Sequence, residues 1–69
     1  MNKIKVVALL TEVMNELENC CTGGIGKDGP TLEELDTYTE EHGQPMEGDS
    51  VYHMAQRCYR LVEAAKKEL

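Results

Sequence analysis

The sequence contains no phenylalanine or tryptophan, and its aromatic residues are three tyrosines. Large aromatic side chains supply much of the buried area in small proteins. A chain of 69 residues is already near the size at which one hydrophobic core barely suffices. We therefore expect residues 1–69 to form a single domain whose core is marginal in a monomer. Self-association, most simply as a twofold homodimer, is expected to complete it.

Long apolar runs are also absent. No stretch of the sequence approaches the roughly 18 consecutive apolar residues that mark a membrane-spanning helix. The formal net charge of −6 at pH 7 argues against binding to nucleic acid or to an anionic membrane surface. The sequence thus predicts a cytoplasmic protein with no membrane partner and no direct nucleic-acid partner.

Cysteine is scarce, and the three cysteines are an odd number. Cys20, Cys21 and Cys58 lack the spacing of a disulfide framework, which predicts reduced thiols in a reducing compartment. There is no C-x-x-C motif, and His53 and Cys58 point about 140° apart on a helix, so we expect no metal site. Since no nucleophile and base fall at helical spacing, we expect neither a cofactor nor enzymatic activity.

Basic residues are missing from the middle of the chain. Between Asp28 and Gln56 the sequence has no lysine or arginine, whereas acidic residues are frequent. They are Asp28, Glu33, Glu34, Asp36, Glu40, Glu41, Glu47 and Asp49. This block predicts either a solvated face or an acidic docking surface, on which complementary fields would speed association with a basic partner.

Apolar residues recur at helical spacing near both ends of the chain, which predicts two long amphipathic helices over residues 2–21 and 50–68. In the first helix the apolar arc comprises Val6, Leu9, Leu10, Val13, Met14, Leu17, Cys20 and Cys21. In the second it comprises Val51, Met54, Ala55, Cys58, Leu61, Val62, Ala65 and Leu69. We expect these two arcs to pack against each other. The other side of the second helix, expected to face solvent, carries His53, Arg57, Arg60 and Lys67.

The segment between the two long helices begins with a glycine-rich loop over residues 22–31. Thr31 and Glu34 have the spacing of a capping box, which predicts a short acidic helix over residues 32–42 that ends before Gly43. Asp49 or Ser50 is the expected cap of the last helix. The expected fold class is therefore all-α. The two long helices are joined by the glycine-rich loop and the short acidic helix, and dimerisation completes a helical bundle.

The acidic middle helix is the leading candidate for a partner-binding site. Its candidate residues are Glu33, Glu34, Asp36, Tyr38, Glu40 and Glu41. Tyr38 is the expected anchor, because aromatic side chains with a polar tip are favoured at interface centres. By analogy of size and charge, the chain is similar to accessory proteins that phages and mobile elements encode. We expect it to bind and modulate a protein with a basic surface, for example as an inhibitor of a nucleic-acid-binding or defence protein.

An alternative hypothesis is a dimeric binder of a small anionic ligand such as a nucleotide signal, held by glycine amides and basic side chains. The candidate residues are Gly24, Gly26, Lys27, Arg57 and Arg60. The segment 23–27 resembles the glycine–lysine core of the phosphate loop in nitrogenase-iron-protein-like ATPases. Because Asp28 replaces the magnesium-binding Ser or Thr, we expect no nucleotide hydrolysis. A third hypothesis is a structural component that docks through Ile4 and Ala8.

Overall fold

The computed structural model describes residues 2–20 and 24–69, and this part of the chain is all-helical, with no strand. The elements are α1 (Lys3–Cys20), α2 (Leu32–His42), the short 3-10 turn η1 (Met46–Gly48) and α3 (Ser50–Lys67). The predicted all-α class is therefore confirmed. Residues 21–23, where we expected the first helix to end, lie outside the described residues.

Local side-chain and glycine signals set the ends of the helices. Asn2 and Asp49 each accept a hydrogen bond from the backbone N–H three residues further on, which satisfies a free donor of the first helical turn. The capping box is present: Thr31 Oγ1 accepts from Glu34 N at 3.2 Å, and Glu34 Oε1 accepts from Thr31 N at 3.0 Å. Gly43 ends α2 in the left-handed region, at φ 66°.

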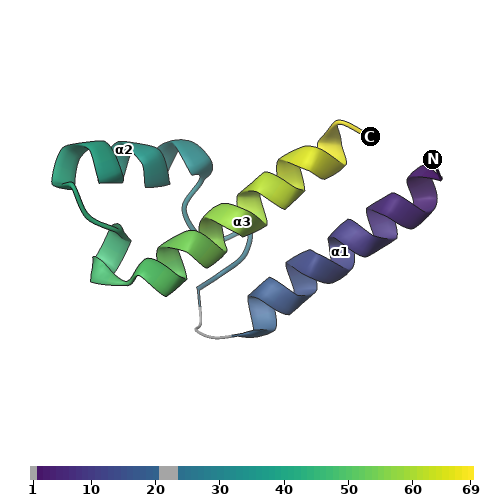
Figure 1. Cartoon of the computed structure of the whole chain (residues 1–69), viewed down its shortest axis with the longest axis horizontal. Coiled ribbons are helices and arrows are strands. Elements are labelled where there is room, and N and C mark those ends of the chain that lie inside the picture. The colour runs from purple at the N-terminus through teal and green to yellow at the C-terminus, as the bar shows by residue number, and fades with distance from the viewer. Residues whose placement is uncertain (1, 21–23) are drawn as a thin grey trace.

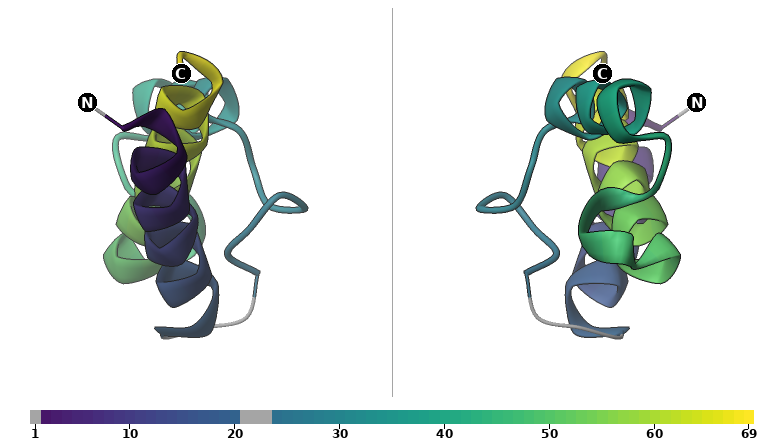
Figure 2. Two further views of the ribbon diagram at one scale, coloured as in Figure 1. Left: turned by 90° about the vertical axis from the view of Figure 1, so that its right-hand side faces the viewer. Right: turned by 90° about the vertical axis from the view of Figure 1, so that its left-hand side faces the viewer.

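The helices form a flat layer rather than a globule. α1 and α3 run antiparallel and side by side, and α2 lies at the end of the layer away from the two termini (Figure 1). The Cα atoms extend over 41 × 23 × 17 Å. The glycine-rich loop lies on one side of the α1–α3 pair, the side away from the viewer in Figure 1, as the two edge-on views in Figure 2 show. One face of the layer is therefore covered by the loop, and the opposite face carries no covering segment in the described part of the chain.

The buried core is small and sits between α1, α3 and the loop. Met14, Ile25 and Tyr59 are buried together, and the partly buried side chains packed around them are Leu17, Tyr52, Ala55 and Val62. Burial raises the pKa of the Tyr59 phenol, and the Glu18 carboxylate, which also hydrogen-bonds the phenol, raises it further. Leu35 of α2 is also fully buried, and its side chain anchors this helix to the rest of the molecule.

The inward side of α3 is not the one that its apolar pattern indicates. Val51, Met54 and Leu61 are 58%, 64% and 46% exposed, whereas His53 and Gln56 are buried. The expectation that the two apolar arcs cover each other is thus wrong for much of both arcs, since Leu9 and Val13 of α1 are also exposed. Cys58, expected to be packed, is exposed as well. Tyrosine rings and hydrogen-bonded polar groups occupy much of the inward side of α3, and of its predicted arc Ala55 and Val62 pack against the core beside them.

The Gln56 side chain explains this rotation of α3. Its Oε1 accepts from Gly26 N at 2.8 Å, and its Nε2 donates to Gly26 O and Pro30 O, each at 2.9 Å. A buried amide is stable only when its donors and acceptor are satisfied, and here the loop satisfies them. A β-carbon at Gly29 would lie 2.8 Å from Gln56 Nε2, so only glycine fits there. Gln56 thereby holds the loop against α3.

Replacing Gln56 with leucine should destabilise the protein by at least about 2 kcal/mol, because buried backbone groups of the loop lose their partners and each loss costs about 1–3 kcal/mol. Urea unfolding followed by circular dichroism measures the change. Gln44→Leu is the matched control, since Gln44 is exposed, and its stability should stay within about 0.5 kcal/mol of the parent. Equal stability of the two variants would contradict the assigned role of Gln56.

Candidate functional site

The acidic residues of α2 border an open hollow on the surface. It has a volume of about 360 Å³ and is lined by Glu33, Glu34, Thr37, Tyr38, Glu41 and Met46. Residues 33, 37 and 41 are four apart, so they stand on one side of the helix. The side of α2 that faces solvent therefore gathers three of the predicted partner-binding carboxylates around Tyr38.

Tyr38 is held in a defined position at this hollow. Its ring stacks on the His42 imidazole, with ring centroids 4.0 Å apart and an interplanar angle of 16°. His42 Nδ1 also lies 3.1 Å from the Tyr38 carbonyl oxygen. Tyr38 is half-buried, so part of its side chain is accessible from outside. A stacked aromatic loses little further conformational freedom on binding, which suits it to anchor a partner.

The six predicted partner-binding residues differ in how they are engaged within the chain. Asp36 does not line the hollow. Its carboxylate accepts instead from the Arg57 guanidinium, with Nε–Oδ1 and Nη2–Oδ2 distances of 3.1 and 3.4 Å. Glu40 is exposed and also lies outside the hollow. Thr31 holds the pKa of the Glu34 carboxyl below its ordinary value of 4.5, mainly through a hydrogen bond from its backbone N–H and, to a lesser extent, through one with its side chain.

The base of the acidic site is tied to α3 through His53. Met46 N donates to His53 Nδ1 at 3.0 Å, so this nitrogen is unprotonated. Thr39 Oγ1 donates to the Leu35 carbonyl oxygen and lies 3.4 Å from His53 Nε2. The arrangement favours the neutral tautomer in which Nε2–H donates to Thr39. One buried ring thus links α2, η1 and α3 and fixes where the hollow lies.

The predicted anion-binding residues come together only in part: Gly24, Gly26 and Lys27 share one hollow, but the arginines are engaged within the chain. The glycine-rich loop forms its own hollow of about 280 Å³, lined by Glu18, Gly24, Ile25, Gly26, Lys27, Asp28 and Gly29. Two carboxylates border it, and the N–H of Gly26 already donates to Gln56. Arg57 is paired with Asp36 on another side of α3. The geometry gives the small-anion hypothesis no support.

Arg60 acts within the chain instead. Its guanidinium donates to the carbonyl oxygens of Lys27, Gly29 and Pro30 at 2.8, 2.7 and 3.1 Å, and to Glu63 Oε1 at 3.0 Å. It therefore supports the same loop as Gln56, one helical turn away.

Sequence reasoning missed His53, Gln56 and Arg60 as inward-facing residues. Together with Tyr52, Tyr59 and Glu63 they recur at three- and four-residue spacing, which is the signal of a second, polar and aromatic, face on α3. A pattern search restricted to aliphatic residues passes over such a face.

In the described residues, no group of three or more His, Cys, Asp or Glu side chains could hold a metal ion. Among the helices described, none combines the length and apolar character needed to cross a bilayer. No protein-family model matches the chain, and no curated protein or solved structure matches it.

The lowered pKa of Glu34 predicts a specific acid sensitivity. Since the folded-state pKa lies below the unfolded value of 4.5, the stability that Glu34 contributes is present above that pH and is lost as the pH falls. Glu34→Gln should therefore lose less stability than the parent between about pH 5 and about pH 3. Urea midpoints across this range measure it. Glu33→Gln removes the same charge without the cap contact and should retain the parental slope; equal slopes for all three proteins would contradict the assignment.

Proposed function

We propose that this chain is a non-enzymatic interaction protein that binds a protein with a basic surface through the acidic side of α2 and modulates its activity. The observation that carries the proposal is the hollow bordered by Glu33, Glu34 and Glu41 around Tyr38. Carboxylates at its border favour a lysine or arginine side chain entering it, and the tyrosine offers that side chain an apolar and π-electron contact.

The charge distribution of the whole chain supports the same class of partner. With a net charge of −6 and its acidic block between Asp28 and Asp49, the protein attracts basic surfaces at long range and repels phosphates. A surface of this kind suits an inhibitor that occupies the basic groove of a nucleic-acid-binding or defence protein, as a phage or mobile element would encode. We propose that the protein acts in the cytoplasm and as a homodimer.

Charge reversal at the hollow tests the proposal. Glu33→Lys with Glu41→Lys should weaken binding to an arginine-rich peptide at least about tenfold, because each reversal exchanges an attraction for a repulsion of about 0.5–1 kcal/mol. Titration calorimetry at low and high salt measures both the affinity and its salt dependence.

The matched control changes the net charge equally at exposed positions outside the hollow. Glu40→Lys with Glu47→Lys should weaken peptide binding distinctly less than the first pair, since only long-range attraction is lost. Equal losses in the two variants would show that overall charge, and not the hollow, attracts the peptide. Absence of binding by the parent protein would contradict the proposed function.

A further inference from the structure

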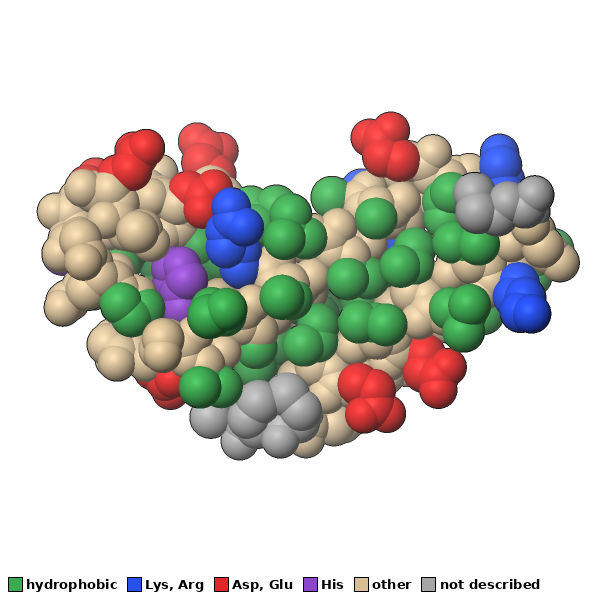
Figure 3. Space-filling model, in the orientation of Figure 1, with side chains coloured by type: hydrophobic (Ala, Val, Ile, Leu, Met, Phe, Trp, Pro, Cys, Tyr) green, Lys and Arg blue, Asp and Glu red, His purple; other side chains and the backbone are tan. Residues whose placement is uncertain are grey.

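The layer of helices leaves one broad apolar face open. Exposed apolar side chains from α1 and α3 gather there, and they form the open face: Leu9, Val13, Val51, Met54, Cys58 and Leu61. Cys58 is two positions from both Gln56 and Arg60, or about 200° around the helix, so this stripe of α3 lies opposite the side that holds the loop. In Figure 3 the hydrophobic side chains form a band along α1 and α3 on the side nearer the viewer.

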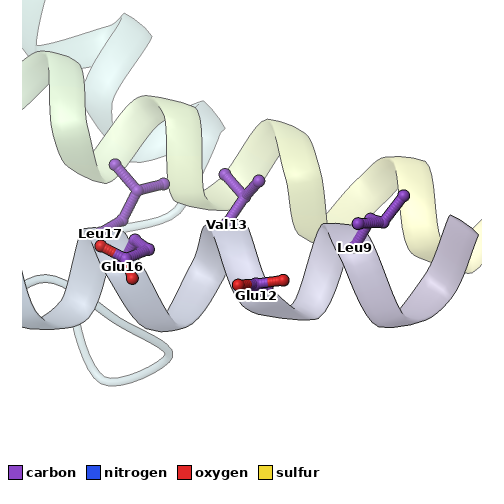
Figure 4. A pocket seen from close by; sticks show the side chains of 5 residues that line it. All are labelled: Leu9, Glu12, Val13, Glu16 and Leu17. Carbon is purple, nitrogen blue, oxygen red and sulfur yellow. The ribbon is translucent and has the colours of Figure 1, made fainter.

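The open face contains a groove and a hollow between its apolar side chains. On α1 an open groove of about 470 Å³ is lined by Leu9, Glu12, Val13, Glu16 and Leu17. Figure 4 shows the three apolar side chains pointing towards α3, with Glu12 and Glu16 on the outer border. On α3 a smaller hollow of about 120 Å³ is lined by Met54, Arg57, Cys58 and Leu61. Apolar ridges and hollows with a charged border are the anatomy of a helix-packing interface.

From this geometry we infer that a second copy of this chain covers the open face, with the two α3 helices packed antiparallel about a twofold axis near Cys58. This deepens, and rests on, the homodimer proposed above. The Cα atoms of the whole layer extend over 41 × 23 Å, and a standard interface buries roughly 800 Å² on each partner, so an interface of that size would take up most of one face of the layer. The resulting four long helices form a bundle around a shared core.

The stripe on α3 matches an antiparallel copy of itself. Val51 and Ala65 are each seven residues from Cys58, and Met54 and Leu61 are four and three residues from it. An antiparallel pairing centred on Cys58 therefore sets Val51 of one copy against Ala65 of the other, and covers the stripe along the whole helix. A pairing with the same ends together would instead set Val51 against Val51 and Ala65 against Ala65.

The charge distribution also favours the antiparallel arrangement of the two copies. The acidic residues of α2 lie at one end of the layer, whereas both chain termini lie at the other (Figure 1). The basic side chains near the termini are Lys3, Lys5, Lys66 and Lys67. Opposed copies bring these lysines towards the acidic end of the partner, whereas aligned copies would place like charges together. The twofold arrangement also points the two acidic hollows to opposite ends of the dimer.

Analytical ultracentrifugation of the full chain tests the covered face. The parent should sediment as a dimer, and Leu61→Glu should weaken dimerisation at least about a hundredfold, because a carboxylate would be buried without a partner. The control is Ile4→Glu: Ile4 is 84% exposed and lies nine positions, or about 180°, from Val13 on α1. Ile4→Glu should remain dimeric. Circular dichroism should report folded helices in both variants.

Disulfide cross-linking tests the orientation. In a chain whose three cysteines are replaced by serine, Val51→Cys and Ala65→Cys proteins are mixed and oxidised. Opposed copies predict a mixed-species cross-link between the two variants, whereas aligned copies predict that each variant cross-links only to itself.

The possible results distinguish the arrangement of the dimer from the homodimer itself. A monomeric parent would overturn the homodimer itself and leave the open face to a different protein. A Leu61→Glu variant that stays dimeric would show that the dimer forms through a surface other than the open face. Self-cross-linking of Val51→Cys without the mixed product would overturn the antiparallel orientation alone. Binding of the arginine-rich peptide is read out separately, so failure of the acidic hollow is distinguishable from each of these results.

Discussion

Which side of α3 faces inward depends on the hydrogen bonds between the Gln56 amide and the glycine-rich loop. The loop offers backbone groups of Gly26 and Pro30 that no helix of its own can satisfy, and the amide supplies the matching donors and acceptor. Arg60 reinforces the same attachment through three loop carbonyls. With this side of α3 committed to polar partners, the aliphatic stripe is turned away from the loop. The shape of the molecule follows from that commitment.

A flat layer has two faces, and here the loop covers one of them. The small buried cluster of Met14, Ile25 and Tyr59 lies under the loop, whereas the larger aliphatic side chains remain on the other face. A chain of this size that exposes so much of its apolar area has more to gain from covering it than from any single surface ion pair. The polar contacts between α3 and the loop thus also leave the aliphatic face of the layer open.

The acidic helix combines structural and exposed charges within eleven residues. The Glu34 carboxylate accepts from the backbone N–H of the cap residue Thr31, and Asp36 pairs with Arg57 of α3. Glu33 and Glu41 border the hollow around Tyr38. The buried side chains of Leu35 and His53 hold α2 in place. His53 accepts a hydrogen bond from η1 and lies close to Thr39. Rigid placement of a few free carboxylates beside a stacked aromatic ring is what separates a candidate binding site from an ordinary solvated face.

The sequence by itself determined the helical class, the capping box at Thr31 and Glu34, and the left-handed turn at Gly43. These features depend on groups a few residues apart, so local patterns reveal them. The acidity of the exposed side of α2 follows from composition in the same way. Only the tertiary structure decided which side of each long helix faces inward and that Asp36, Arg57 and Arg60 are engaged within the chain. The reason is that Gln56 meets Gly26, a partner 30 positions away, and a helical periodicity of three to four residues carries no information about such a distant group.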